Sequence, residues 1–211
     1  MKRFQMITEA DARVLDYGST VVLVAGGHVT PLAHDTLKAR RISIVRDGHD
    51  VDVESLAPKA DIKVVAIASD HTGVALKNTI LQHLRGRGIA VHDLGTHTSE
   101  AVDYPDTAAS AAVQVSRGEA DAGIVIDGAG LGSTIAANKV NGVRAAMCLN
   151  QTLARYAREH NGANVLALGS TLVTPADALA IVDTFLDTPM REARYIRRLA
   201  KIRQLEQQAG N

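Results

Sequence analysis

Residues 122–140 read AGIVIDGAGLGSTIAANKV, which joins an apolar run, a glycine-rich turn and a helical pattern. The run AGIVI is short and is bounded by a turn, so it predicts a buried strand. Gly128, Gly130 and Gly132 alternate along the turn, and glycine permits positive φ and close approach of the backbone to a neighbour. A strand, a tight turn and a helix in this order are typical of the repeating unit of a parallel sheet.

The same alternation extends through most of the chain on both sides of this stretch. Four other strand-like runs, KVVAIAS, IAVHDLG, VRAAMCL and VLALG, are separated by helical patterns, and residues 175–208 have the pattern of two further helices. Strands that alternate with helices indicate βαβ units, right-handed crossovers and a parallel sheet. We therefore expect one α/β domain over residues 61–211, with ligands at the carboxyl ends of its strands.

Residues 1–60 have a different pattern, and the polar stretch 46–61 separates them from the rest. Thr8 begins one helical pattern, residues 21–25 form a short apolar run, and Thr30 followed by Pro31 is a typical start of a second helix. We expect a small helix-strand-helix extension that is marginal as an independent domain. Its predicted role is to pack on the rest of the chain or to act as an assembly or docking unit in a larger assembly.

The composition excludes several classes of function. The 23 basic and 23 acidic residues balance, so no overall field attracts nucleic acid or an anionic membrane, and aromatic residues, at 3%, are too few for base-stacking platforms. No apolar run approaches the ~20 residues that cross a bilayer, and the N-terminus lacks a secretory pattern. The single cysteine, Cys148, excludes an intrachain disulfide and a CxxC metal site. We expect a cytoplasmic protein without nucleic-acid or membrane partners.

Two polar segments directly follow expected strands. Asp70 and His71 come after KVVAIAS, and they are either a functional pair or a helix cap followed by a surface histidine. The loop 127–133 presents backbone N–H groups near a helix N-terminus, an arrangement suited to an anion. A dinucleotide site is the competing interpretation, but GxGxG lacks the GxGxxG spacing and follows the third strand rather than the first.

Two further groups lie nearer the C-terminus. His160 and Asn161 end a helical pattern, and a histidine there either transfers protons near neutral pH or is merely solvated. Arg194 and Arg198 stand four residues apart on one helical face, which suits two guanidinium groups to one phosphate. A solvated basic helix face has the same pattern, so the arginines alone do not decide between these interpretations.

Taken together, these segments resemble the ribose-5-phosphate isomerase B family of sugar-phosphate isomerases, which includes the galactose-6-phosphate isomerase subunits. The resemblance covers nearly all of residues 63–208 and follows the order of the family's motifs. The matching strings are SDHTGVALK, DLGT, VDYPDTA, GEADAGIVI, the GxGxG loop with IAANKVNGVRAA, REHNGANVLALGS and RYIRR. The resemblance implies a Rossmann-like parallel sheet between helices and a homodimer or tetramer whose active sites are each shared by two subunits. It also implies interconversion of an aldose phosphate and a ketose phosphate without metal or cofactor.

Carried over motif by motif, the resemblance implies that Asp70 and His71 contact the substrate and that Tyr104 lies in the pocket wall. Loop amides would surround the enediolate formed in the reaction. The loop residues in question are Gly128, Gly130, Gly132 and Ser133.

The resemblance assigns the remaining roles to the C-terminal groups. His160 would be the acid and base of ring opening, and Asn161 would contact a sugar hydroxyl. Arg194 and Arg198 would hold the phosphate.

The base position departs from the family pattern. Asp127 stands where many members carry a cysteine base, and Ser133 stands where a subset carries a glutamate. Asp127 is then the candidate base, because a carboxylate can carry out enolisation. Cys148 does not align with the family's cysteine and is expected to be a buried strand residue.

Two other departures concern substrate contacts. Ala129 replaces the hydroxyl residue that usually follows the base by two positions, and Thr171 stands where many members have an arginine for phosphate. Arg191 or Arg197 would then take over that contact.

The sequence therefore favours an aldose-ketose isomerase of a sugar phosphate, with ribose 5-phosphate as the default substrate. The departures leave open a tetrose phosphate, another pentose or hexose phosphate, or an unphosphorylated acid sugar. A sugar-phosphate binder without turnover remains the alternative from a different class.

Overall fold

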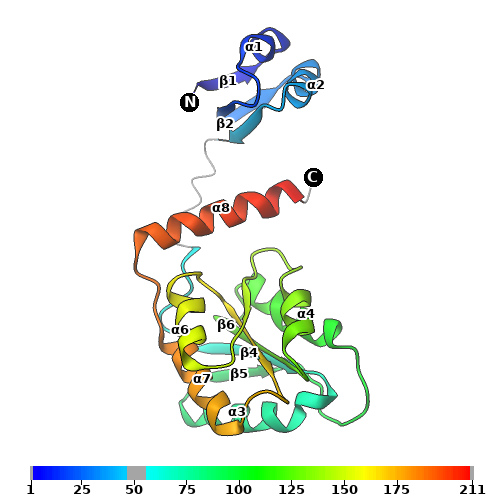
Figure 1. Ribbon diagram of the computed structural model, residues 1–211, viewed down its shortest axis with the longest axis vertical. Coiled ribbons are helices and arrows are strands. Elements are labelled where there is room, and N and C mark those ends of the chain that lie inside the picture. The colour runs from blue at the N-terminus through cyan, green and yellow to red at the C-terminus, as the bar shows by residue number, and fades with distance from the viewer. Residues whose placement is uncertain (1, 47–55, 210–211) are drawn as a thin grey trace. The chain divides into compact units, whose positions relative to one another are not determined.

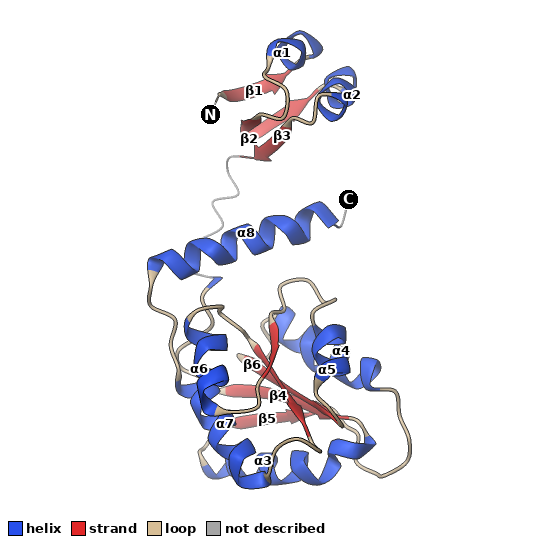
Figure 2. Ribbon diagram, viewed as in Figure 1, coloured by secondary structure: helices blue, strands red, loops and turns tan. Residues whose placement is uncertain are grey.

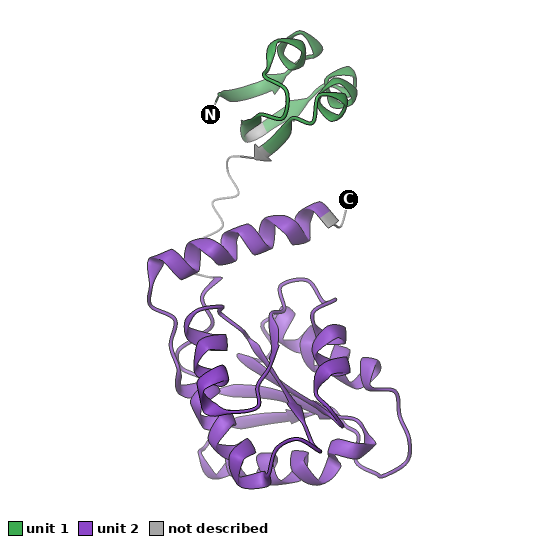
Figure 3. Cartoon of the chain, in the orientation of Figure 1, with its two compact units in different colours: residues 1–52 green, residues 53–211 purple. Residues whose placement is uncertain are grey.

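The computed structural model describes residues 2–46 and 56–209, which fall in two compact units, residues 1–52 and 53–211 (Figure 3). The predicted boundary stretch lies for the most part in residues 47–55, outside the described residues. Leu56 and Lys59 belong to the second unit, where their carbonyl oxygens accept hydrogen bonds from Arg144 and Arg158. No described helix is both long and apolar enough to cross a membrane.

The second unit is built on one five-stranded parallel sheet (Figure 2). Its strands are β4 (Val64–Ser69), β5 (Ala90–Asp93), β6 (Ala122–Asp127), β7 (Ala145–Met147) and β8 (Val165–Gly169). They lie in the order β5-β4-β6-β8-β7, and every adjacent pair is parallel. The expected α/β fold with a parallel sheet is confirmed.

Helices connect the strands, as the alternating pattern predicts. They are the short η2 (His71–Gly73) with α3 (Val74–Gly86), then α4 (Tyr104–Ser116), α5 (Leu131–Ala137), α6 (Gln151–Glu159), α7 (Pro175–Asp187) and α8 (Ala193–Ala209). Both C-terminal helices expected from residues 175–208 are present.

The two faces of this sheet are packed by different side chains. Successive strand residues point to opposite faces, so Val65 and Ile67 of β4 face one layer and Ala66 and Ala68 face the other. The first layer contains α3, α6 and α7 with large aliphatic residues and Phe185, whereas the second contains α4 and α5 with many alanines. Because alanine is small, α4 and α5 approach the sheet closely. Both faces are covered, which a parallel sheet requires.

The first unit is a smaller three-stranded parallel sheet with two helices (Figure 1). Its elements are β1 (Arg3–Ile7), α1 (Glu9–Val14), β2 (Thr20–Val29), α2 (Pro31–Ala39) and β3 (Ser43–Arg46), and the strand order is β1-β2-β3. The predicted helix starts are confirmed, since the Thr8 and Thr30 side chains each accept a backbone hydrogen bond three residues on.

The expected helix-strand-helix pattern was incomplete, because a strand also lies at each end of the first unit. The sequence of β1, RFQMI, gives no apolar run, since Arg3, Gln5 and Met6 are exposed. β3 has only four residues and adjoins the polar stretch. Pairing with β2 on both sides, rather than local sequence, stabilises these two strands.

Candidate active site

The order of the strands marks one place in the large sheet, at the carboxyl ends of β4 and β6. From β4 the chain crosses to β5 on one side, whereas β6 leads to β7 and β8 on the other side. In a parallel sheet this reversal leaves a crevice outside the carboxyl ends of the two central strands, where ligands bind. Asp70 directly follows β4 and Asp127 is the last residue of β6, so both carboxylates lie at the reversal. Both residues are buried and retain only 6% and 5% exposure.

Asp70 caps the short helix that follows β4. Its Oδ1 accepts hydrogen bonds from the Thr72 amide at 2.8 Å, the Thr72 hydroxyl at 2.6 Å and the Gly73 amide at 3.2 Å. The helix-cap interpretation is therefore correct for Asp70, and the cap also orients the next residue. His71 is half-buried, and its Nδ1 accepts from the Val102 amide at 3.4 Å. In the neutral imidazole this bond leaves the proton on Nε2, which is then free to donate to a ligand.

The glycine loop packs tightly against its neighbours at two positions. Gly130 has a φ of 78°, and a Cβ there would lie 2.9 Å from the backbone nitrogen of Gly169. At Gly132 a Cβ would lie 2.6 Å from ring atoms of Tyr104. Glycine at these positions therefore lets the loop approach β8 on one side and the Tyr104 ring on the other. Tyr104 is thereby brought beside the loop, as the pocket-wall prediction requires.

The Asp127 side chain folds back onto its own loop. Oδ1 accepts from the amides of Ala129, at 2.8 Å, and Gly130, and Oδ2 accepts from the amide of Ser133 at 2.7 Å. The sequence predicted that the loop amides bind an anion. Three of them are instead bonded to the carboxylate of Asp127. The amides of Gly128, Leu131 and Gly132 make no hydrogen bond to the described residues.

Three buried hydroxyl groups surround the Asp127 segment without a partner among the described residues. Ser133 follows it in α5, Ser170 donates its backbone amide to the Asp127 carbonyl at 2.8 Å, and Ser69 ends the neighbouring β4. Buried hydroxyl groups normally have partners, so these three are available to water or to the hydroxyls of a ligand.

The C-terminal candidates form a second group around one aromatic side chain. His160 is stacked on Tyr156, with ring centroids 4.7 Å apart, and contacts the Tyr195 ring at 4.6 Å. The guanidinium groups of Arg194 and Arg198 lie 4.6 and 5.4 Å from the centre of the Tyr195 ring. Asn161 donates to the Tyr156 carbonyl at 2.9 Å. The predicted proton-transfer and phosphate residues are therefore neighbours.

Tyr195 and Tyr156 were not selected from the sequence. The available signal was their spacing, since Tyr195 lies between the two arginines and Tyr156 stands four residues before His160.

The two groups lie at opposite ends of the strands: the first group at their carboxyl ends and the second at their amino ends. His160 ends α6 and precedes β8, whereas Asp127 is level with Gly169 at the far end of β8. Five strand residues separate these levels by roughly 15 Å. Asp127 and His160 of one chain therefore cannot contact the same small sugar. Asp70, His71, Tyr104 and the glycine loop are brought together, but His160, Asn161, Arg194 and Arg198 are not joined to them within one chain.

Thr171 and Cys148 have structural surroundings. The Thr171 hydroxyl donates to the Gly128 carbonyl at 2.6 Å, which ties the segment after β8 to the glycine loop. Cys148 is buried directly after β7, and burial raises the pKa of its thiol to about 12. A thiol with that pKa remains protonated near neutral pH and is a poor base or nucleophile.

Comparison with known proteins identifies the family of this site. The family described as Ribose/Galactose Isomerase matches residues 65–202, which include every strand of the second unit from Val65 onward and most of α8. The chain belongs to the ribose/galactose isomerase family. Asp70, Asp127, His160 and both phosphate-binding candidates lie inside the matched range.

Individual members of the ribose/galactose isomerase family align over almost their whole length. The ribose-5-phosphate isomerase B of Escherichia coli (strain K12) is 43% identical over 146 residues, which are 69% of this chain and 98% of that protein. The Clostridium thermocellum ribose-5-phosphate isomerase B structure is 49% identical with a TM-score of 0.68, over 69% of this chain and 99% of its own.

A third member has been determined with a bound sugar phosphate. The Mycoplasma genitalium ribose-5-phosphate isomerase B structure, with bound ribulose-5-phosphate, is 42% identical with a TM-score of 0.66 and covers 68% of this chain and 96% of its own. None of these three alignments covers more than 69% of this chain, and the family match begins only at residue 65.

The described residues contain no cluster of three or more His, Cys, Asp or Glu side chains arranged to hold a metal ion.

Proposed function

We propose that this protein interconverts a phosphorylated aldose and ketose through an enediolate, with ribose 5-phosphate and ribulose 5-phosphate as the default pair and no cofactor. The observation that carries the proposal is the position of Asp127. Its buried carboxylate lies at the reversal of the strand order, beside loop amides that have no partner among the described residues. Membership of a family of sugar-phosphate isomerases supports the same reaction class.

The geometry of Asp127 leaves one position for proton transfer. A carboxylate offers about four lone-pair positions, two on each oxygen. Oδ1 accepts from two amides and Oδ2 from one, so a single position remains on Oδ2. In the proposed mechanism Oδ2 takes the proton from the carbon next to the carbonyl and returns it to the neighbouring carbon. The amide bonds hold the carboxylate in place, so little reorganisation precedes each transfer.

The negative charge that develops on the substrate oxygens needs donors. The amides of Gly128, Leu131 and Gly132 have no described partner and belong to the loop that begins beside the base. The buried hydroxyl of Ser133 is equally unpartnered. We propose that these groups stabilise the enediolate and that Ser133 replaces the hydroxyl missing at Ala129.

The complete site is proposed to contain residues of two chains in a homodimer. Within one chain, His160 lies at the opposite sheet edge from Asp127, so the ring-opening histidine of each site would come from the partner. Its stacking on Tyr156 and its tilted contact with the Tyr195 ring fix the imidazole plane in advance of binding. Arg194 and Arg198 accompany His160 and would bind the phosphate of the same substrate.

The identity of the substrate is also a proposal. The Thr171 hydroxyl donates to the glycine loop and adds no charge. Phosphate binding therefore depends on the arginines of α8 and on Arg191, which precedes this helix. Another tetrose, pentose or hexose phosphate, or an acid sugar, is compatible with such a site.

The decisive experiment is hydrogen-deuterium exchange at the carbon next to the carbonyl, followed by NMR in D2O across tetrose, pentose and hexose phosphates. Exchange reports proton abstraction directly, and the sugar that exchanges fastest identifies the substrate. We expect Asp127→Asn to reduce exchange at least about a hundredfold, the lower range for loss of a general base.

Asp127→Cys is the matched variant, because it supplies the side chain that many family members carry. Recovery of exchange in the cysteine variant but not in the asparagine variant would identify position 127 as the base. Amide shifts of Gly130 and Ser133 show whether the loop keeps its conformation in each variant. Undiminished exchange in Asp127→Asn would refute Asp127 as the base.

One observation favours the second candidate function, a sugar-phosphate binder without turnover. Three loop amides are bonded to the Asp127 carboxylate. In a binder without turnover, this carboxylate would only hold the loop in shape and would not transfer a proton. Saturable binding of ribose 5-phosphate to the wild-type protein, without exchange or conversion of any sugar tested, would support this binder.

A further inference from the structure

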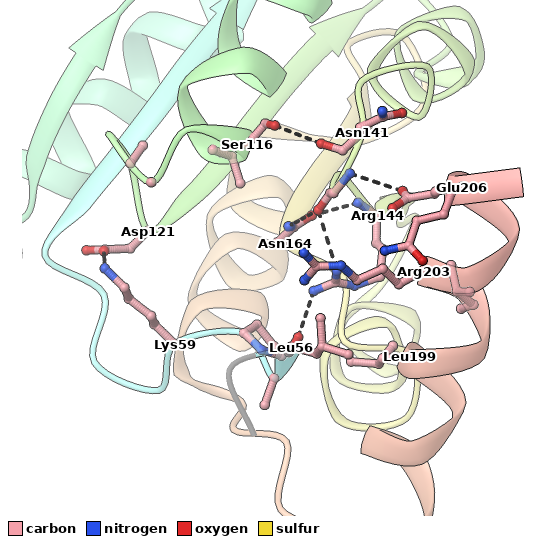
Figure 4. A pocket seen from close by; sticks show the side chains of 18 residues that line it. Leu56, Lys59, Ser116, Asp121, Asn141, Arg144, Asn164, Leu199, Arg203 and Glu206 are labelled. Carbon is pink, nitrogen blue, oxygen red and sulfur yellow. Dashed lines mark hydrogen bonds and ion pairs between the residues drawn. The ribbon is translucent and has the colours of Figure 1, made fainter. Parts of the chain in front are cut away.

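A cavity of about 500 Å³ lies at the amino ends of the strands of the large sheet, whereas Asp127 lies at their carboxyl ends. Figure 4 shows the side chains that line it. Its wall includes Asp121, Arg144 and Asn164, which directly precede β6, β7 and β8. Arg203 and Glu206 of α8 line the other side, so the cavity separates this helix from the body of the unit. A volume of this size accommodates a small metabolite.

Arg144 brings a positive charge to the cavity wall, and none of the described carboxylates is bonded to it. Its guanidinium donates to the carbonyl oxygens of Gly162, at 2.7 Å, and Leu56, at 3.0 Å, with a longer contact to Gly142. Carbonyl groups satisfy hydrogen bonds but do not neutralise the charge. Burial lowers the pKa of Arg144, Glu206 opposes that change, and the nearby positive charge of Arg203 adds to it.

A second arginine, Arg158, lies near Arg144 and is more deeply buried. Arg158 is fully buried and donates to the carbonyls of Ala163 and Lys59, at 3.0 and 2.7 Å, while its Nε has no partner among the described residues. Burial and the charge of Arg144 lower its pKa to about 10. Two adjacent guanidinium groups with only neutral partners leave this edge of the sheet short of negative charge.

Among the remaining charged groups of the wall, Glu206 offsets the positive charge of Arg144 only in part. Lys59 and Asp121 are paired with each other, and Asp121 also accepts from the amides of Lys63 and Val64. The Glu206 carboxylate accepts from the Gly142 amide at 3.1 Å. Arg203 is exposed and forms no ion pair with the described residues, so its guanidinium is available to a ligand.

We propose that this cavity binds a small phosphomonoester, whose phosphate lies between Arg144 and Arg203. Arg144 retains N–H groups beyond those used by the carbonyls, and a guanidinium group suits a phosphate through paired hydrogen bonds. The side chain of Asn141 provides an amide group for hydroxyls, while Leu199 and Ile202 provide an apolar side.

Occupation of this cavity would tie α8 to the sheet. Arg198 lies five residues before Arg203 on the same helix, which is about 7.5 Å along the axis. A phosphate held between Arg144 and Arg203 therefore limits the movement of the arginines proposed for substrate binding. This consequence rests on the proposed function, whereas binding in the cavity does not.

The test uses the full-length protein and glycerol 2-phosphate, an ester with no carbonyl group to isomerise, in 1H-15N NMR titrations. We expect saturable shifts at the amides of Gly118 and Gly142, which line the cavity. Arg203→Gln should weaken this binding about tenfold or more, because a charged donor pair to the phosphate is lost.

Two variants separate this site from other phosphate contacts. Lys201→Gln removes a neighbouring exposed charge of α8 that does not line the cavity, and it should leave the affinity unchanged. Arg198→Gln weakens the proposed substrate site and should leave the shifts at Gly118 and Gly142 in place.

Absence of saturable shifts at these two amides would overturn the proposal, and so would equal affinity in wild type and Arg203→Gln. Loss of the shifts in Arg198→Gln rather than in Arg203→Gln would assign the phosphate to the substrate site instead. Failure of the isomerase proposal would appear in the exchange experiment and would not alter this titration.

Discussion

Asp70 and Asp127 use the same local geometry on adjacent strands. Each accepts at Oδ1 from the amides two and three residues ahead, so each carboxylate closes a turn at a strand end. The difference is at Oδ2, which in Asp127 is bonded to Ser133 and is directed toward the start of α5. The same residue type therefore shapes a turn in one case and is also a candidate base in the other.

The close packing of the glycine loop against β8 predicts a large effect of Gly130→Ala. A Cβ at this position would combine the strain of φ 78° with a 2.9 Å contact to the backbone of Gly169. We expect a loss of about 2–4 kcal/mol in the free energy of unfolding, measured by urea denaturation.

Gly118→Ala is the control for that substitution, since Gly118 has a φ of 73° and open space around a Cβ. Its expected cost is about 1–2 kcal/mol, from the backbone conformation alone. Equal losses in the two variants would show that the contact with β8 contributes nothing.

At the scale of elements, α8 is attached to the unit by few buried residues. Leu199 is its buried aliphatic anchor, and its side chain packs on Gly162, where a Cβ would lie 2.6 Å from Leu199 Cδ1. Leu205 on the same helix is 64% exposed. The position of Arg194 and Arg198 therefore depends largely on one apolar contact.

Leu199→Ala is expected to release α8 before the rest of the unit unfolds. Removal of a buried leucine side chain costs about 2–5 kcal/mol, and the loss falls on the docking of this helix. Amide hydrogen exchange in α8 should accelerate while exchange in β6 remains slow. Leu205→Ala should leave both rates nearly unchanged, and faster exchange in β6 in the Leu199 variant would contradict local release.

At the scale of the whole molecule, the separation of Asp127 from His160 predicts complementation between variants. Asp127→Asn and His160→Asn should each be inactive as homodimers. If each site combines both chains, half of the mixed molecules are heterodimers with one intact site of two, and roughly a quarter of wild-type activity returns.

The measurement is the isomerase rate after the two variants are unfolded and refolded together. The same variants refolded separately and then combined at once are the control. No recovery after joint refolding would contradict a shared site.

The division of the chain predicts different effects of two N-terminal deletions. Removal of residues 1–60 deletes the Leu56 and Lys59 carbonyls that accept from the half-buried Arg144 and the fully buried Arg158. We expect this deletion to cost the second unit about 3–5 kcal/mol, whereas removal of residues 1–52 leaves its melting transition nearly unchanged.

Calorimetry of the two deletion variants measures this difference, and equal melting temperatures would contradict it. Sedimentation of the shorter deletion tests the predicted role of residues 1–60 in a larger assembly. An unchanged particle size would remove that role.

The amino-acid sequence by itself determined the α/β class and the positions of the strands of the second unit. The strand AGIVID and the loop after it were identified because apolar runs and glycine spacing are local signals. The motifs also selected Asp70, Asp127, His160 and the α8 arginines as candidates. The sequence did not predict the short strands β1 and β3, because their stability comes from pairing with β2 rather than from their own residues.

Tertiary structure decided which of these residues are neighbours. The sequence predicted that the glycine-loop amides bind an anion, but in the fold the Asp127 carboxylate accepts hydrogen bonds from three of them. The fold also separates Asp127 from His160 across the sheet, because α6 runs antiparallel to the strands and ends at the opposite edge. The charge-rich cavity beside Arg144 has no local signal, since its walls come from separate segments between residues 56 and 207 that only packing brings together. Local patterns specify elements, whereas contacts between distant segments determine the site.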